Sequence, residues 1–248
     1  MAPTGFHGLL GLLLATRIDP STNHGQRIRV GLVWGSTLPD LDILGSSVIT
    51  LITGDLNLAV TFHRSVTHSL PIIGLLMILG YGWKRNSMIL GVGFGMFLHV
   101  LLDFLYLEGI SWFWPFQAWG DRTYVVPFTY MDLDPLLAKI LLTLDGYFEF
   151  IFYLVMAGFA KRTNTCHELS ISWPKELIIR DWPNKLQRLA LGLFFLMIIF
   201  LGFAVYSHTW PDMTVETYTI VLYFPLLPVY FISGLLPYLM RETIQNIP

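Results

Sequence analysis

The sequence predicts an all-α, polytopic helical membrane protein with about five full spans and shorter N-terminal helices. Two properties of the chain support this prediction. Of the 248 residues, 54% are hydrophobic and only 13% are charged, whereas soluble domains carry about 25% charged residues. Such a chain has too few charges to cover a surface that faces water. The charges also cluster, which leaves long uncharged stretches for the interior of a bilayer.

Five stretches are apolar over a length that reaches or approaches the roughly 20 residues that a helix needs to cross a membrane. They are residues 69–83, 87–107, 135–160, 189–206 and 217–240. The last two contain no charged side chain, and the first is rather short. We therefore expect about five full spans.

Three shorter apolar pieces lie near residues 5–16, 28–38 and 43–54. None is long enough for a simple span. We expect half-helices, tilted helices or re-entrant segments, which are tolerated at membrane depth only where protein or a polar cavity covers them. We expect no cleaved signal peptide, because no positive charge precedes the apolar run at 9–15.

The distribution of Lys and Arg predicts the orientation, because short cytoplasmic loops are enriched in these residues. Basic residues occur at 84–85, throughout 161–188 and at Arg241, so we expect these segments and the C-terminus to be cytoplasmic. The acidic loop 108–134 and the loop 207–216 then face the other side. Aromatic residues of the first loop predict a belt at the membrane interface; they are Trp112, Phe113, Trp114, Phe116 and Trp119.

We interpret residues 1–248 as a single membrane domain. Residues 5–130 carry the candidate site, 161–188 form a polar cytoplasmic loop, and 189–240 form two C-terminal membrane helices. The net charge of −2 and the pI near 6.4 argue against nucleic acid as a partner, because a phosphate backbone requires a basic surface. The single cysteine, Cys166, excludes an intramolecular disulfide and thiolate zinc sites. Any metal must therefore be held by His, Asp and Glu.

His99 and Asp103 interrupt one of the predicted spans, in the sequence FLHVLLDFL. A spacing of four places both side chains on one face of a helix, one turn apart. Polar residues inside apolar helices are costly and usually functional. Two interpretations are equally open: two ligands of one metal, or a hydrogen-bonded pair that tightens helix packing.

The segment HRSVTHS at 63–69 contains two further candidate ligands, His63 and His68. Residues five apart do not share a helical face, but their side chains can converge if the chain turns between them. Arg64 could then bind an anionic group. The alternative is an ordinary polar loop that precedes a helix.

The motif LPDLD at 38–42 places two carboxylates in an otherwise apolar region. Asp40 and Asp42 offer the oxygen ligands that hard or borderline cations prefer. The alternative is a helix break at Pro39, with Asp40 near the start of the next helix, where the helix dipole favours a negative charge. His7 is a weaker candidate, because a lone His in an apolar run is more often a packed core residue.

The predicted topology places these four clusters at similar depth. His68 lies at the outer start of the span 69–83, and His99 lies in the outer half of the span 87–107. His7 and the LPDLD motif lie toward the outer ends of their apolar pieces. Polar residues from distant parts of the sequence at one depth favour a shared site.

Asp145 and Glu149 form a second pair with a spacing of four, within the span 135–160. They could be additional ligands, a proton relay or partners of Lys139. We rank them below the other clusters. His24, His167 and His208 lie in polar stretches and are expected at the surface.

These motifs together resemble the YdjM-type family of inner-membrane, predicted metal-dependent hydrolases. The resemblance rests on His7, LPDLD at 38–42, HRSVTHS at 63–69, HVLLD at 99–103, WFWPF at 112–116 and a second Pro-Phe at 127–128. It covers roughly residues 5–130 and implies an integral protein of the bacterial inner (plasma) membrane. That family is in turn similar to zinc-dependent phospholipase C and related nucleases, which are helical proteins with clustered zinc ions.

The resemblance implies a divalent metal, with zinc as the first choice. It assigns as ligands His7, Asp40, His63, His68, His99 and Asp103. Asp42 would lie beside the ligands or bridge two ions. The chain has no clear second HxxxE helix, for which Asp145 and Glu149 are the nearest equivalent, so a full three-metal site does not follow.

The expected function is hydrolysis of a phosphodiester or ester bond in a lipid-like or amphipathic substrate, by metal-activated water. Asp42 or Asp103 would act as general base, and Arg64 would stabilise phosphate charge. Membrane lipid is then the expected partner. Two alternatives remain. Intramembrane acids and His also fit an ion or metal transporter, and in a non-catalytic structural or regulatory protein the His–Asp pairs would only hold helices together.

Overall fold

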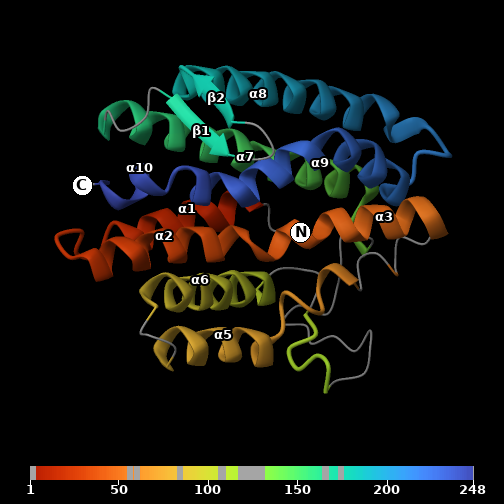
Figure 1. Cartoon of the computed structure of the whole chain (residues 1–248). Coiled ribbons are helices and arrows are strands. Elements are labelled where there is room, and N and C mark those ends of the chain that lie inside the picture. Colours follow the sequence, from red (N-terminus) through yellow and green to blue (C-terminus); the bar gives the residue numbers. More distant parts are fainter. Residues whose placement is uncertain are drawn as a thin grey trace.

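The computed structural model describes residues 4–54, 58, 62–82, 86–105, 110–116, 132–163, 168–172 and 176–247, and the statements below concern this part of the chain. The fold is helical except for one antiparallel hairpin, in which Glu168 pairs with Arg180 and Ser172 pairs with Glu176. Figure 1 shows the helices stacked side by side, from α8 through α7 and α9, then α1 and α2, to α6 and α5. The elements are α1 (Thr4–Ala15), α2 (Asn23–Thr37), η1 (Pro39–Asp42), α3 (Ile43–Thr53), α5 (Leu70–Gly82), α6 (Ser87–Phe104), α7 (Pro135–Thr163), β1 (Glu168–Ser172), β2 (Glu176–Arg180), α8 (Trp182–Tyr206), η3 (Ser207–Thr209), α9 (Val215–Leu239) and α10 (Arg241–Gln245).

Four helical segments are long and apolar enough to cross a membrane: α6, α7, α8 together with η3, and α9. This confirms the prediction of a polytopic helical membrane protein. The stretch 69–83 differs from the expected full span, since it forms the 13-residue helix α5. At about 1.5 Å per residue, such a helix is about 20 Å long, which is shorter than a hydrocarbon core of about 30 Å.

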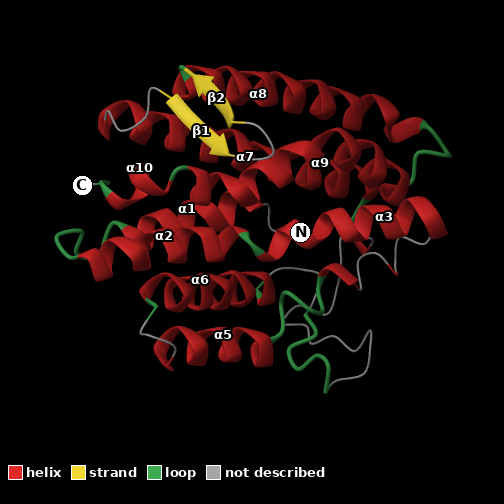
Figure 2. Ribbon diagram, in the orientation of Figure 1, coloured by secondary structure: helices red, strands yellow, loops and turns green. Residues whose placement is uncertain are grey.

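Two predicted boundaries also shift. The loop expected at 161–188 is shorter than predicted, because α7 continues to Thr163 and α8 begins at Trp182. Between them in the sequence lies the β1–β2 hairpin, drawn as two arrows in Figure 2. The basic residues at 84–85 lie outside the described residues, so the predicted orientation stays a prediction.

Helices α2 and α6 pack backbone against backbone through glycines spaced four apart. A Cβ atom on Gly35 would lie 2.2 Å from the carbonyl oxygen of Val92, and one on Gly95 would lie 2.3 Å from that of Leu32. Gly31 of α2 meets α6 in the same way, at 2.2 Å from the Met88 carbonyl oxygen. Small residues permit this close approach of membrane helices. The crossing brings the end of α2 against the second half of α6, where His99 lies.

Helix α2 does not end in a reversal of the chain. The backbone stays in the right-handed helical region at Leu38, Asp42 and Ile43 while it passes through η1 into α3. Pro39 occupies the start of η1, where its missing N–H group costs little. Helix α3, which continues this path, ends at Gly54, where the φ of 68° favours glycine. The Asp40 and Asp42 carboxylates therefore lie at a break within a longer helical segment.

Candidate metal centre

His99 and Asp103 lie one turn apart on α6, and both side chains are buried. The Nδ1 atom of His99 lies 2.8 Å from the carbonyl oxygen of Ser36, which can only accept a hydrogen bond. Nδ1 is therefore protonated, and in the neutral ring that binds metal Nε2 carries the lone pair. That lone pair faces Asp40, whose Oδ1 is 3.4 Å away, and His68, whose Nε2 is 3.2 Å away.

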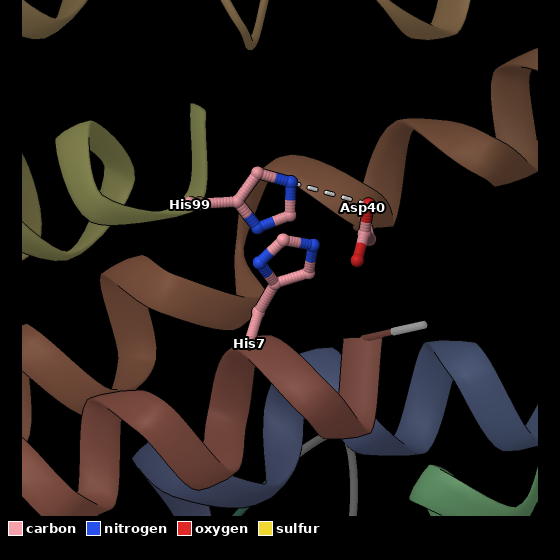
Figure 3. Close-up of side chains that lie close together, drawn as sticks. All are labelled: His7, Asp40 and His99. Atoms are coloured by element: carbon pink, nitrogen blue, oxygen red, sulfur yellow. Dashed lines mark ion pairs between the residues drawn. The ribbon is translucent and has the colours of Figure 1, made fainter. Parts of the chain in front are cut away.

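His7 reaches the same place from α1. Its Nε2 lies 3.1 Å from Asp103 Oδ1, and its ring stacks on His99 with a centroid distance of 3.7 Å. Figure 3 shows the two imidazole rings facing each other beside the Asp40 carboxylate. His7 is fully buried and lies in the centre, although its sequence context alone favoured a packed core residue.

His63 and His68 converge, as expected if the chain turns between them. Asp42 accepts a hydrogen bond from His63 Nδ1 and another from the Thr67 hydroxyl. Because that hydroxyl donates to Asp42, its oxygen accepts from His68 Nδ1, 2.9 Å away. In the neutral form of both rings, Nε2 is therefore the unprotonated nitrogen. His63 Nε2 lies 3.8 Å from Asp40 Oδ1, and His68 Nε2 lies 3.2 Å from Asp103 Oδ2.

These residues form three overlapping groups, and within each group the ligand atoms lie within 4.8 Å of one another. The groups share members and are all buried; they are His7–Asp40–His99, Asp40–His63–His68 and His68–His99–Asp103. Among the described residues, His7 Nδ1, Asp40 Oδ2 and His63 Nε2 are buried atoms without a hydrogen-bond partner. Since unpaired buried polar atoms are costly, these nitrogen and oxygen atoms fit the ligands of a bound cation.

The tautomers give a second test of that fit. With Nδ1 protonated, the Nε2 atoms of His68 and His99 direct lone pairs toward each other across 3.2 Å and toward the carboxylates of Asp40 and Asp103. Such an array of acceptors is repulsive unless a cation or additional protons lie between them. Imidazole and carboxylate are the ligands that zinc takes in the absence of thiolates.

The pKa values of two histidines outside the spans, His68 and His63, are shifted in opposite directions. Burial lowers the pKa of His68, which favours the neutral ring that binds metal. Burial also lowers the pKa of His63, but the neighbouring Asp42 and Asp40 carboxylates outweigh it and raise that pKa overall.

Arg64 lies at the edge of the centre rather than in a solvent-exposed position. Its side chain is buried, and Nη2 lies 3.7 Å from Asp103 Oδ2. The guanidinium therefore compensates part of the carboxylate charge. Its backbone carbonyl accepts the N–H of Ser111 at 3.3 Å.

The aromatic segment 110–116 supports the ligand-bearing turn. The N–H of Leu70 donates to the Trp112 carbonyl at 2.9 Å, and the Ser69 hydroxyl donates to the Trp114 carbonyl. Phe113 and Phe116 remain exposed, as an interfacial belt requires. Trp119 and the second Pro-Phe at 127–128 lie outside the described residues. Sequence reasoning missed this supporting role, and it also missed the Ser36 carbonyl and the Thr67 hydroxyl.

Asp145 and Glu149 do not belong to the three groups. Glu149 instead accepts the N–H of Gly5 at 2.6 Å and a hydrogen bond from Ser233. Lys139 donates to the Ser207 carbonyl at 3.4 Å. His24 and His208 are exposed, as predicted, and His167 lies outside the described residues.

Comparison with family models shows that residues 1–211 match the YdjM inner membrane protein family. Comparison with curated proteins and with solved structures gave no match. The matched region contains the whole candidate centre and extends through α8, well past the motifs at 5–130 on which the resemblance rests. The chain is therefore an integral membrane protein that belongs to the YdjM inner membrane protein family.

Proposed function

We propose that this protein is a membrane-embedded, metal-dependent hydrolase that cleaves a phosphodiester or ester bond in a lipid-like substrate. One observation carries the proposal. The Nε2 atoms of His68 and His99 lie 3.2 Å apart in a buried cluster that also contains the carboxylates of Asp40 and Asp103. Packing alone gives no reason to collect so many acceptors in one place.

The residues of the chain divide into two roles. His7, Asp40, His63, His68, His99 and Asp103 would hold the metal, for which zinc is the first choice. When bound, a divalent ion of this kind supplies a Lewis acid and lowers the pKa of a coordinated water to about 7. The Ser36 carbonyl, the Asp42 carboxylate and the Thr67 hydroxyl oxygen accept from Nδ1 of His99, His63 and His68, and so hold these rings in the tautomer that such an ion requires.

The contacts refine the expected catalytic roles. Both oxygens of Asp42 are engaged, by His63 and by Thr67, which favours orientation of ligands over proton abstraction. Both oxygens of Asp103 are engaged as well, Oδ1 by His7 and Oδ2 by His68 and Arg64, so these contacts do not choose between Asp42 and Asp103 as the general base. Arg64 supplies a positive charge that a phosphate brought to the cluster would meet.

The position of the centre along the helices supports a lipid-like substrate. His99 lies twelve residues after the start of α6, which corresponds to about 18 Å along the helix. His7 lies against the middle of α7, because Gly5 and Gly8 on either side of it contact Phe148 and Phe152. A substrate must therefore bring its reactive bond within the thickness of the helical bundle, as an amphipathic molecule does.

The alternative of an ion or metal transporter gains support from one feature. The helical segment α2–η1–α3 is broken at Asp40 and Asp42, and broken helices with ion-binding groups at the break are typical of transporters. Metal flux into proteoliposomes would support that alternative, and hydrolysis without flux would support the enzyme.

Metal analysis of the protein purified in detergent tests the proposal first. We expect bound zinc or another divalent metal in the wild type, loss of metal in His99→Ala and His68→Ala, and no change in His208→Ala, which alters an exposed ring. The same preparations are then assayed on phosphodiester and ester lipids. Absence of metal from the wild type, together with unchanged behaviour of His99→Ala, would refute the proposal.

A further inference from the structure

Glu149 is a fully buried carboxyl at the midpoint of α7, the helix Pro135–Thr163. An acidic residue at the centre of a membrane span is costly and calls for a specific partner. The partners of Glu149 are a backbone amide of α1 and a hydroxyl of α9. Neither is a member of the metal cluster.

The amide contact fixes the start of α1. Glu149 Oε1 accepts the N–H of Gly5, 2.6 Å away, and Gly5 is the second residue of α1. The first four N–H groups of a helix have no partner within the helix, and a carboxylate is favoured at this positive end of the helix dipole. Glu149 therefore binds α1 at its N-terminus.

The hydroxyl contact connects Glu149 to α9. Ser233 donates to Glu149 Oε2, and its oxygen lies 3.0 Å from the Tyr153 hydroxyl. Tyr153 in turn donates to the carbonyl of Val229 at 2.8 Å. Glu149 thus joins α1 to two long helices from the C-terminal half of the chain.

Packing restricts α1 on both sides of His7. A Cβ atom on Gly5 would lie 2.5 Å from the Phe148 carbonyl oxygen, and one on Gly8 would lie 2.6 Å from the Phe152 ring. The helix α1 is pressed against α7 at these two glycines, and His7 lies between them. On its other side His7 meets Asp103 at 3.1 Å.

We infer that Glu149 is a positioning residue for His7: it binds the N-terminus of α1 and so holds the ring in the metal centre. The expected effect on metal binding rests on the proposed function, whereas the contact between Glu149 and α1 does not. The role also explains how α7 and α9 contribute to the centre, although their side chains lie outside the three candidate ligand groups.

Metal affinity in nanodiscs, measured by competition with a chromophoric zinc chelator, provides the first test. Glu149→Leu removes the acceptor for the Gly5 N–H and should weaken zinc binding on the order of 10- to 100-fold, as loss of groups that orient ligands does. Glu149→Gln retains an oxygen acceptor and should bind zinc nearly as the wild type does. An equal loss in both variants would overturn the inference and indicate that Glu149 is itself a ligand.

A double-mutant cycle with His7 separates positioning from general damage. In a His7→Ala background, Glu149→Leu should cause no further loss of zinc affinity, because its effect passes through that ring. Additive losses would overturn the inference. Thr143→Val is the matched control on α7, since Thr143 is buried and bonds Tyr218 rather than α1; it should leave zinc affinity unchanged.

A distance measurement tests the same inference without metal. Spin labels at Leu13 on α1 and Leu101 on α6, both exposed, report the position of α1 in a Cys166→Ser chain. Glu149→Leu and Gly5→Ala should each shift or broaden this distance, and Glu149→Gln should not. An unchanged distance in Glu149→Leu would refute the positioning role even if the wild type bound no metal, whereas absence of metal alone would refute only the proposed function.

Discussion

At the scale of single residues, the candidate centre depends on hydrogen bonds that select one imidazole nitrogen. Thr67 illustrates this. Its hydroxyl donates to Asp42 and accepts from His68, so one small side chain orients a carboxylate and a ring together. Groups that orient ligands in this way are worth 10- to 100-fold in metal affinity in comparable sites, to order of magnitude.

We expect Thr67→Val to weaken zinc binding about 10-fold, because the methyl group that replaces the hydroxyl cannot bond either partner. Thr67→Ser keeps a hydroxyl and should restore most of the affinity. Zinc titration of the three proteins measures the effect. If Thr67→Val bound zinc as tightly as the wild type, the proposed tautomer of His68 would lack its physical support.

Substitutions of His99 and Asp103 distinguish a metal centre from a pair of residues that only packs helices together. If His99 and Asp103 only hold helices together, each single substitution should destabilise by about 3–5 kcal/mol, whereas joint replacement by Leu should be close to neutral. If they bind metal, the joint variant should lose metal and function even when it is stable. Thermal unfolding, metal content and lipid hydrolysis of His99→Leu, Asp103→Leu and the double variant decide between these outcomes.

At the scale of the elements, the α2–α6 crossing determines where His99 lies. The carbonyl of Ser36 can reach His99 Nδ1 only because the helices approach backbone to backbone at Gly35 and Gly95. The sequence of each helix contains two glycines four residues apart, Gly31 and Gly35 in α2 and Gly91 and Gly95 in α6. The motif identifies a close-packing face but not the helix that packs on it.

Gly35→Ala should destabilise the protein by about 1–3 kcal/mol, because its methyl group would meet backbone atoms of Val92 that cannot move aside. The metal content should fall with it. Gly158→Ala on α7 meets nothing within 4 Å and should be neutral or slightly stabilising, by up to about 1 kcal/mol. Thermal unfolding in matched detergent compares the two; equal stability would contradict the close approach of α2 and α6.

The exposed apolar face of α3 leads to a second prediction at this scale. It continues the right-handed helix of α2 through η1, and exposed apolar side chains follow one face, with Val48 at 53%, Leu51 at 73% and Ile52 at 78% exposure. We expect this face to contact lipid, so that α2, η1 and α3 cross the bilayer as one broken helix.

Cysteine accessibility measures this arrangement. In a Cys166→Ser chain, Leu51→Cys should react slowly with a membrane-impermeant maleimide in intact vesicles. Asp212→Cys, in the exposed turn before α9, should react rapidly from whichever side that turn faces. Comparable rates at both positions would place α3 in water and contradict a broken span.

At the scale of the whole molecule, the candidate metal ligands come from four segments that are far apart in sequence. These segments are α1, the break between α2 and α3, the turn before α5, and α6. A cation bound only by the folded protein stabilises it by an amount that grows with ligand concentration, about 4 kcal/mol at a thousand times the dissociation constant. Removal of the metal should therefore weaken the N-terminal half of the protein.

We expect a chelator to lower the unfolding temperature of the wild type by several degrees and to leave His99→Ala unchanged, since that variant should already lack the metal. Addition of zinc in excess should reverse the effect in the wild type only. The same shift in both proteins would mean that the chelator acts elsewhere than at this cluster.

The sequence by itself determined the membrane class and the chemistry of the site. The cost of exposing or burying a charge depends mainly on residue type, so uncharged runs predicted the spans α8 and α9. Long apolar stretches predicted α6 and α7 although charged residues interrupt them. The spacing of His99 and Asp103 fixed a shared helical face for the same local reason. The four motifs named candidate site residues, because imidazoles and carboxylates are costly in apolar segments unless they bind something. The resemblance to the YdjM-type family selected six of them as metal ligands.

Only the tertiary structure decided how these residues meet. The length of α5, the approach of α2 to α6, and the choice of Nε2 at three rings depend on contacts between segments far apart in sequence. Glu149 shows this dependence most directly. Its spacing from Asp145 left open additional ligands, a proton relay or a partner of Lys139, but its partners are the N–H of Gly5 and the hydroxyl of Ser233. The spacing of two residues within one helix does not say which other helix will place its terminus beside them.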